Sequence, residues 1–355
     1  MEKKKRGGGG ESTYKQQQNT VNKRKYTITK KPKTMIPLTI LDLRTSPLTL
    51  FGRLSLEELL FRHSPKLSPS VGHRQQRRQR NYLLIGNCNV GRDWRIRTSL
   101  ETPPTTKAKK KGKEFNIILG IGGKINKLVN FDELKSHAVR QEGDDSNVTI
   151  IRRFTGGGTV VSDFLNTEFV SFIMTSSLSN LGVKGSEGPR GIMKWSRDFV
   201  YGEVFEDAGD ESMVQFDLIE NDYVIRSPTG SVRKIGGNAQ AIAGDKFVHH
   251  TSFLFDYDED VMRVLRLPER RPVYRGDKGH GDFVVGMGKG FKGYFSRGDL
   301  YDSVIKVVSR KFFVEDVLGY DDMVRGGVFD GKWEEWVRGE GGYGRGTRNR
   351  IITDV

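Results

Sequence analysis

The positive charge of this chain is concentrated in three stretches, and this limits which residues can form its core. The 355 residues carry a formal net charge of +15. Residues 1–35, 65–80 and 91–114 carry +9, +5 and +5, so the remaining residues together carry −4. Segments rich in charge and poor in apolar side chains cannot bury enough surface to fold. We therefore predict a disordered basic tail over residues 1–35, basic insertions at 65–80 and 91–114, and a folded domain over residues 36–320.

Composition excludes several classes of protein. Cys88 is the only cysteine, which excludes a disulfide scaffold, a Cys-rich zinc site and an iron–sulfur cluster, and favours a reducing compartment. No apolar run approaches the ~18 residues that span a bilayer, and no signal-peptide core follows Met1. The sequence therefore predicts a soluble intracellular protein without membrane partners. A duplex-binding protein would carry its basic charge on a folded face, so nucleic acid is not the expected partner.

Strands and helices alternate through the predicted domain. Leu56, Leu59, Leu60 and His63 follow the i, i+3, i+4, i+7 spacing of one helix face. The patterns predict helices over residues 54–62, 131–139, 192–205 and 300–312, and strands over residues 38–43, 81–86, 116–121, 148–153, 168–174, 221–226, 231–235 and 247–255. Because hairpins occur beside crossovers, we expect one α/β or α+β domain with a mixed sheet flanked by helices. Residues 321–355 are rich in Gly and Arg and are predicted to be loose.

The first segment that carries chemistry runs from Ile151 to Asp163. Two arginines, Arg152 and Arg153, precede Thr155 and the three glycines of 156–158. Glycines let a ligand approach the backbone, and successive N–H groups can hold an anion. Adjacent strand residues face opposite sides, so one of the two arginines is expected to reach the ligand. The spacing fits neither a P-loop nor a dinucleotide fingerprint, and a flexible connector is the alternative.

The second segment is a hairpin turning at Pro228–Thr229. Pro at the second turn position and Gly at the fourth suit a type I turn. This register places Lys234 opposite about Tyr223, within a residue or two of Asp222. A lysine on an inner strand must be paired or occupied, because burying an unpaired ammonium is costly. The alternative is a surface hairpin with an exposed lysine.

The third segment holds His249 and His250. Only one of two neighbouring strand residues can point into a site, so a two-histidine metal pair is not expected. The chain also lacks an obvious third ligand at metal spacing, and we predict no protein-bound metal. The alternative role is a core histidine with its hydrogen bonds satisfied. Thr251 and Ser252 are further polar candidates on the same strand.

These segments resemble a known family when they are taken in order. Residues 152–158 (Arg-Arg-Phe-Thr-Gly-Gly-Gly), followed by Asp163 and Asn166, are similar to the Arg-Arg-x-Ser-Gly-Gly-Gly … His-Asp-x-Gly-Asn segment of lipoate–protein ligases. Asn221-Asp222, residues 233–240 and His249-His250 match further segments of that family in order and spacing. The resemblance covers about residues 54–310. It points to the family that joins lipoate ligases, octanoyl transferases and biotin ligases.

The resemblance implies a mixed sheet akin to that of biotin ligase and an ATP-dependent reaction. Members of the ligase type activate lipoate or octanoate with ATP and Mg²⁺ to an acyl-adenylate, which a carrier lysine then attacks. The carriers would be lipoyl domains of 2-oxoacid dehydrogenases or a glycine cleavage H-type protein. Such carriers make a mitochondrion or plastid plausible, with the cytoplasm still open.

The resemblance also implies roles for individual residues. Lys234 would neutralise charge in both steps, and Asp222 would orient Lys234 or Mg²⁺. The residues implied in binding the adenylate or the substrate are Arg153, Thr155, Gly156, Gly157, Gly158, Asn166, Asn221, Gly237, Ala239 and His250.

The sequence departs from the family pattern at several points. Ser162 stands where the family has His, Leu165 where it has Gly, and no small extra domain follows residue 320. A domain that is dispensable here, a separate accessory chain, or a single half-reaction would account for the last difference. The alternatives are an octanoyl or lipoyl transferase that uses a carrier-bound donor, and a non-catalytic homologue that binds adenylate or acyl groups. Cys88 does not match the catalytic cysteine positions of transferases, and the Gly-Arg-Gly-Arg-x-Gly loop of biotin ligases is absent.

Overall fold

The computed structural model describes residues 35–46, 48–63, 81–88, 114–138, 148–163, 166–175, 181–183, 188–325 and 347–352. They belong to a compact unit that spans residues 32–355. The predicted basic tail and the two basic insertions lie outside the described residues, apart from Met35 and Glu114.

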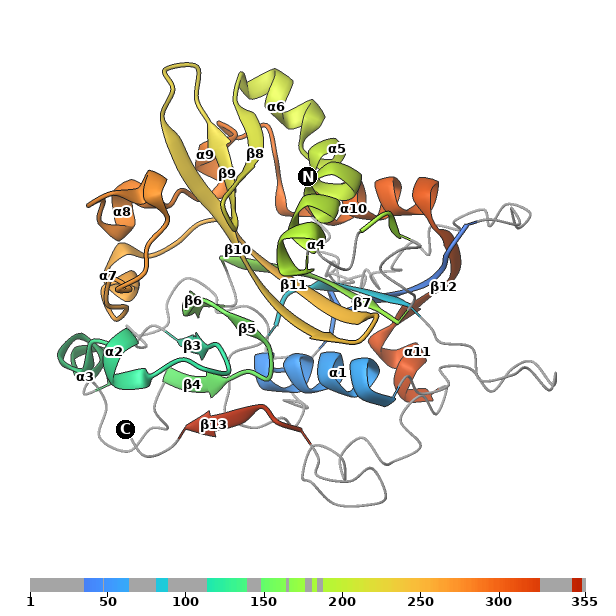
Figure 1. Cartoon of the computed structure of the whole chain (residues 1–355), viewed down its shortest axis with the longest axis horizontal. Coiled ribbons are helices and arrows are strands. Elements are labelled where there is room, and N and C mark those ends of the chain that lie inside the picture. The colour runs from blue at the N-terminus through green and yellow to red at the C-terminus, as the bar shows by residue number, and fades with distance from the viewer. Residues whose placement is uncertain are drawn as a thin grey trace, which may run out of the picture. The chain divides into compact units, whose positions relative to one another are not determined.

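The larger of two sheets runs through the middle of this unit (Figure 1). Within the described residues its strand order is β12 (Phe313–Gly319), β1 (Pro37–Asp42), β2 (Tyr82–Gly86), β7 (Thr167–Met174), β11 (Lys246–Leu254), β10 (Val232–Ala243), β9 (Asp222–Arg226) and β8 (Gln215–Ile219), with β5 (Gly156–Gly157) also paired to β10. Strand β1 is parallel to β12 and β2, whereas the other pairs are antiparallel. The predicted mixed sheet is confirmed.

A smaller sheet lies beside the first. The sequence patterns predicted one mixed sheet and did not distinguish the two. The strand order of the smaller sheet is β13 (Arg350–Ile352), β4 (Val148–Arg152), β3 (Phe115–Leu119) and β6 (Val160–Ser162), and β3 and β4 are parallel. The prediction of a loose segment over residues 321–355 was wrong for residues 321–325, which lie in helix α11 (Tyr320–Arg325) and bury Met323, and for residues 347–352. Here Ile351 and Ile352 pair with Ile151 and Ile150, and Asn349 and Thr347 bond to neighbouring elements.

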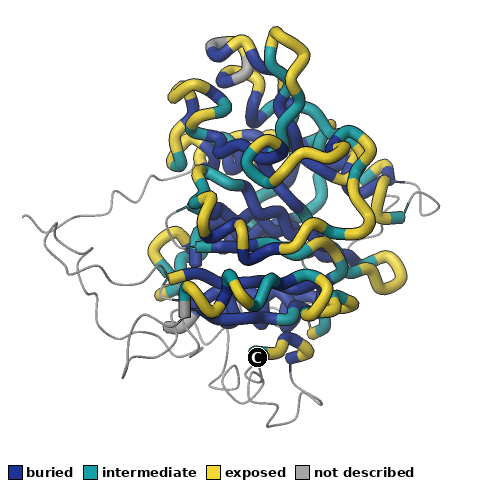
Figure 2. Tube along the Cα trace, turned by 90° about the vertical axis from the view of Figure 1, so that its left-hand side faces the viewer, coloured by how far each residue is buried: buried dark blue, intermediate teal, exposed yellow. Residues whose placement is uncertain are grey.

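Helix α1 (Leu50–His63) packs between the two sheets. One set of its side chains, including Leu56 and Leu60, joins a cluster with β2 and β11, and another, including Leu54, meets Ile118 and Ile151 of the smaller sheet. Nearly every residue of the helix is therefore buried, and buried positions also run along the strands of both sheets (Figure 2). The i, i+3, i+4, i+7 spacing correctly predicted this helix, but it accounted for only part of the buried surface of the helix.

The other helices cover the outer sides of the sheets. The opposite face of the large sheet packs against α4 (Gly188–Ser196), the π-helical segment Arg197–Tyr201, α5 (Gly202–Val204), α6 (Glu206–Ser212) and α10 (Arg297–Lys311). The remaining helices are α2 (Ile125–Leu128), α3 (Phe131–Ala138), α7 (Glu259–Met262), the 3-10 turn Val273–Arg275, α8 (His280–Phe283), α9 (Met287–Gly290) and α11 (Tyr320–Arg325). Among the described helices, none is long and apolar enough to cross a membrane.

Candidate active site

A cavity of about 760 Å³ lies where β10, the strands β5 and β6, and the segment between α7 and α8 come together. One part of its wall is apolar and is formed by Val160, Val161, Leu254, Met262, Leu265 and Phe283. Another part is polar and carries Asp222, Lys234, Asn238, Arg266, Arg270 and Arg271. An apolar pocket with a few convergent charged groups is the usual form of a small-molecule site.

An ion pair forms part of this wall. Lys234 Nζ lies 2.6 Å from Asp222 Oδ1, and 22% of the Lys234 side chain is exposed. In the hairpin Lys234 pairs with Val224, and a bulge then places Gly236 opposite Tyr223. The prediction that Lys234 lies within a residue or two of Asp222 is confirmed. The carboxylate offsets the cost of holding an ammonium away from bulk water.

The glycine-rich segment reaches the cavity because its backbone joins the large sheet. Gly157 pairs with Ala239 and Gly156 with Gln240. Gly157 has φ +133°, and a Cβ there would lie 2.7 Å from the carbonyl oxygen of Asn238. A side chain at this position would therefore be strained and would collide with β10. Gly156, Gly157 and Gly158 all line the cavity.

The residues just before the glycines support this wall from behind. Arg153 is 3% exposed, and its Nη2 donates to the carbonyl oxygen of Gly158 at 2.7 Å. Burial lowers the pKa of its guanidinium to about 10. Arg152 donates instead to the carbonyl oxygen of Gly123. Thr155 is fully buried, and its hydroxyl has no hydrogen-bond partner among the described residues. The sequence placed Arg153 and Thr155 in contact with ligand, but neither side chain lines the cavity.

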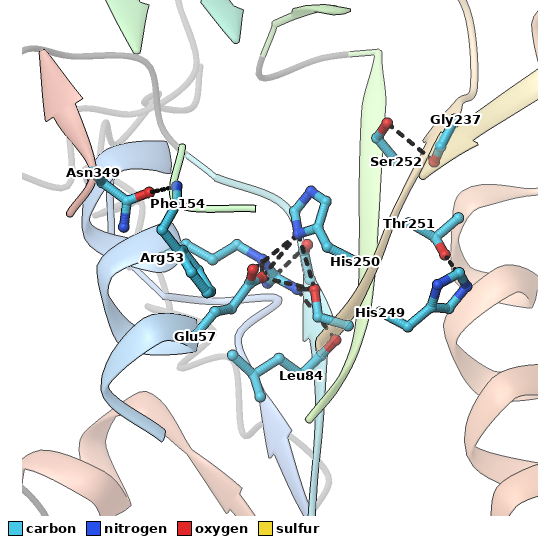
Figure 3. A network of polar contacts seen from close by, with 12 residues as sticks. Arg53, Glu57, Leu84, Phe154, Gly237, His249, His250, Thr251, Ser252 and Asn349 are labelled. Atoms are coloured by element: carbon cyan, nitrogen blue, oxygen red, sulfur yellow. Dashed lines mark hydrogen bonds and ion pairs between the residues drawn. The ribbon is translucent and has the colours of Figure 1, made fainter. Parts of the chain in front are cut away.

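His250 lies on the same face of the large sheet as Ser252 but beneath α1 (Figure 3). Its Nδ1 is 3.0 Å from both carboxylate oxygens of Glu57 and 3.1 Å from Ser171 Oγ. Burial alone would raise the pKa of Glu57, but His250 and Arg53 outweigh it and hold that pKa below its usual value. The prediction that His250 contacts the ligand was therefore wrong. Its ring belongs to a buried polar network with Glu57 and Ser171.

His249 points to the opposite face, as strand alternation requires. Its Nε2 lies 2.8 Å from the hydroxyl oxygen of Tyr223, and its Nδ1 lies 3.1 Å from Gln240 Nε2. Burial lowers the pKa of His249 to about 3, so the ring is neutral. His249 is a core histidine with its hydrogen bonds satisfied.

The remaining predicted residues divide between the cavity and its surroundings. Asn221 and Gly237 line the cavity, and Gly237 is close enough that a Cβ there would lie 3.6 Å from Lys234 Nζ. Ala239 is buried within β10. Asn166 donates to Asp163 Oδ2 at 2.9 Å and accepts from Arg297 at 3.5 Å, which places it away from the cavity. Ala239 and Asn166 therefore do not reach the ligand space that the sequence assigned to them.

The sequence reasoning missed the segment between α7 and α8. It contributes Arg266, Arg270, Arg271 and Arg275 to the cavity wall. The signal was present, because four arginines fall within ten residues of sequence, from 266 to 275.

Residues 113–289 match the lipoyl protein ligase A/B catalytic domain. The chain belongs to the lipoate–protein ligase family. The inactive lipoate–protein ligase 2 of Plasmodium falciparum is 29% identical over 190 residues, which cover 47% of this chain and 46% of that protein. The chain thus spans about half the length of this curated relative.

A solved structure of the family shares the fold. LipL1 of P. falciparum in complex with lipoate has a TM-score of 0.50 and 15% identity, over 83% of this chain and 73% of that one. The bipartite lipoate–protein ligase of Thermoplasma acidophilum has a TM-score of 0.46 and 18% identity, over 85% of this chain and 96% of that one. At 15% identity the likeness to LipL1 concerns the fold alone.

Two further observations concern Cys88 and the metal-binding capacity of the described residues. Cys88 is buried beside α1, does not line the cavity, and has a thiol whose pKa burial raises to about 12. Such a thiol is a poor nucleophile. No group of three or more His, Cys, Asp or Glu that could hold a metal occurs among the described residues, and both oxygens of Asp222 are already engaged.

Proposed function

We propose that this protein activates lipoate or octanoate with ATP and transfers the acyl group to a lysine of a lipoyl carrier domain. The observation that carries the proposal is the Lys234–Asp222 ion pair, whose charged atoms lie 2.6 Å apart. Both residues line the cavity whose wall also includes the glycine-rich segment. A partly exposed ammonium in a partly apolar cavity favours ligands that develop negative charge.

The residues of this wall suit the first step. A carboxylate oxygen of the acid would attack the α-phosphorus, the bond to the β-phosphate would break, and pyrophosphate would leave with the electron pair. Lys234 would stabilise the charge on the α-phosphate as this occurs. Arg266, Arg270 and Arg271 are in reach of the same space and suit the phosphates.

The second step needs less from the protein. The neutral amine of the carrier lysine would attack the acyl carbonyl, and the bond from the acyl carbon to the phosphate oxygen would break. AMP would leave with the electron pair, and the nitrogen would lose its proton to water as the amide forms. Lys234 would again neutralise the oxygen that gains charge. The apolar side chains of the wall would hold the acyl chain, which gains about 0.8 kcal/mol for each buried CH₂.

The carriers are the lipoyl domains of 2-oxoacid dehydrogenases or a glycine cleavage H-type protein. The Thermoplasma acidophilum structure is of a ligase and its E2 lipoyl domain, which supports a carrier of this kind. A protein acting on such carriers in a eukaryote would work in a mitochondrion or plastid.

A binding protein without turnover is the second candidate, because the curated relative is named inactive. The substitution of Ser162 for the family histidine was one reason to consider this function. Ser162 is 3% exposed, lies in β6 opposite Asn116, and does not line the cavity. The serine therefore contributes no group to the cavity wall, and we favour catalysis because Lys234 and Asp222 both line the cavity.

The test is the intact mass of an apo lipoyl domain after incubation with the protein. One tube holds Mg-ATP with octanoate or lipoate, and a second holds octanoyl-loaded acyl carrier protein without ATP. The proposal expects the mass of the acyl group to be added in the first tube alone. A gain in the second tube alone would establish a transferase, and no gain in either, with acyl-adenylate bound tightly, would establish the binding protein.

A further inference from the structure

The carboxylate of Asp222 is divided between two partners. Its Oδ1 lies 2.6 Å from Lys234 Nζ, and its Oδ2 accepts a hydrogen bond from the hydroxyl of Tyr274 at 3.0 Å. Asp222 is 7% exposed, so few water molecules can replace either partner. With one partner on each oxygen, the carboxylate plane has a single orientation.

Tyr274 comes from a different part of the fold than the ion pair. It lies in the 3-10 turn Val273–Arg275, within the segment that brings four arginines to the cavity. The ring of Tyr274 packs against the ring of Phe283, with 5.3 Å between their centroids. The guanidinium of Arg275 lies 4.3 Å from the centroid of the Phe283 ring. The backbone N–H of Val273 donates to Glu220 at 2.6 Å. Two neighbouring residues of the turn thus bind the carboxylates on either side of Asn221.

Resting on the proposed function, we propose that Tyr274 is a positioning residue that orients Asp222, and through it Lys234, for acyl-adenylate formation. The hydroxyl makes the one hydrogen bond from this turn to the ion pair that the described contacts contain, and Arg275 adds the attraction of its charge to Asp222. The hydrogen bond keeps the carboxylate turned so that Oδ1 faces Lys234. The same bond keeps the arginine-bearing segment at the cavity wall.

The protonation of Tyr274 suits this role. Burial, followed by the negative charge of Asp222, raises the pKa of the phenol well above its usual value. The hydroxyl is therefore protonated at neutral pH and can donate to Asp222. A hydrogen bond donated to a buried carboxylate is among the stronger hydrogen bonds in proteins.

The test is Tyr274→Phe, which removes the hydroxyl and keeps the ring on Phe283. Hydrogen bonds to charged groups are worth enough to change a rate by roughly tenfold to a hundredfold. We expect kcat for pyrophosphate release to fall by about tenfold, with the KM for ATP changed less than about twofold. Tyr257→Phe is the matched control, because its hydroxyl bonds to the carbonyl oxygens of Gly281 and Val284 and lies near Arg233, with no contact to Asp222 among the described contacts.

A double-mutant cycle with Asp222→Asn separates positioning from general packing. In the Asp222→Asn background, Tyr274→Phe should lower kcat no further. Equal fold losses in both backgrounds, or an unchanged kcat in Tyr274→Phe, would overturn the inference. If the wild-type protein releases no pyrophosphate, the proposed function fails. The same cycle measured by urea unfolding then decides whether Tyr274 and Asp222 are coupled, and additive shifts would refute that contact.

Discussion

The guanidinium of Arg153 lies directly against Gly157, in the space where any other residue would place its Cβ. A Cβ built at Gly157 would stand 2.6 Å from Arg153 Nη2. Arg153 uses that space to donate to the carbonyl oxygen of Gly158. The glycine-rich wall of the cavity therefore depends on a buried cation beneath it.

We expect Gly157→Ala to destabilise the fold by about 1–3 kcal/mol, because it combines a positive φ with a collision against Arg153. Gly158→Ala is the matched control, since a Cβ there meets no atom within 4 Å. Urea unfolding of both variants measures the difference. Equal stability of the two would show that the strand pairing of Gly157 is not as described.

Lys234→Ala should reduce acyl-adenylate formation by about 100- to 1,000-fold, the usual loss when one charge-stabilising donor is removed. Pyrophosphate release measures the rate, and circular dichroism checks the fold. Lys289→Ala, at an exposed lysine of α9, is the control and should keep full activity. A Lys234→Ala protein with wild-type rates would remove the basis of the proposed function.

Cys88→Ala should keep acyl transfer within about twofold of wild type, because the thiol is buried outside the cavity. The small void left behind should lower the free energy of unfolding by about 1 kcal/mol. The intact-mass assay and thermal melting measure the two effects. A folded but inactive Cys88→Ala protein would bring back a thioester mechanism.

The stability of the protein should fall as the pH drops below 6.5, in part because of His249. Burial lowers the pKa of this ring from 6.5 to about 3, so between these values the unfolded chain binds a proton that the folded protein does not. The free energy of unfolding should decrease by up to about 1.4 kcal/mol per pH unit from this group. His249→Gln removes the titration and should give a shallower slope between pH 6.5 and 4. Identical slopes would mean that the ring is protonated in the folded protein.

Local sequence signals predicted the hairpin of the site well. The turn around Pro228 fixes the register of a hairpin, and register alone brings Lys234 to Asp222. The observed pairing of Lys234 with Val224 differs by one residue from the expected one. The strand predicted over residues 148–153 likewise matches β4, because its apolar run is buried on both sides.

Side-chain direction was much harder to predict than segment identity. Arg153, Thr155 and His250 lie in segments that resemble the family, yet they point into the interior. A resemblance between sequence segments does not reveal toward which side of the sheet a side chain points. The prediction assigned one buried face to the helix that carries Arg53 and Glu57, whereas both residues are fully buried because α1 has a sheet on each side. Arg53 lies one helical turn from Glu57, a spacing that the sequence shows. The other two partners of Glu57, Ser171 and His250, lie more than 100 residues away in sequence, where no local pattern can reveal them.

Strand β13 affects the order in which the site can assemble during folding. Asn349 Oδ1 accepts from the backbone N–H of Phe154, a contact between residues 195 positions apart. Contacts of such high sequence separation form late, because the loop must be closed before any gain is realised. The hairpins β8–β9 and β9–β10 need only short connections, so the Lys234–Asp222 pair can form early. The Lys234–Asp222 pair thus depends on contacts between residues that are close in sequence. The backbone N–H of Phe154, just before the glycine-rich segment, gains its partner only when Asn349 reaches it.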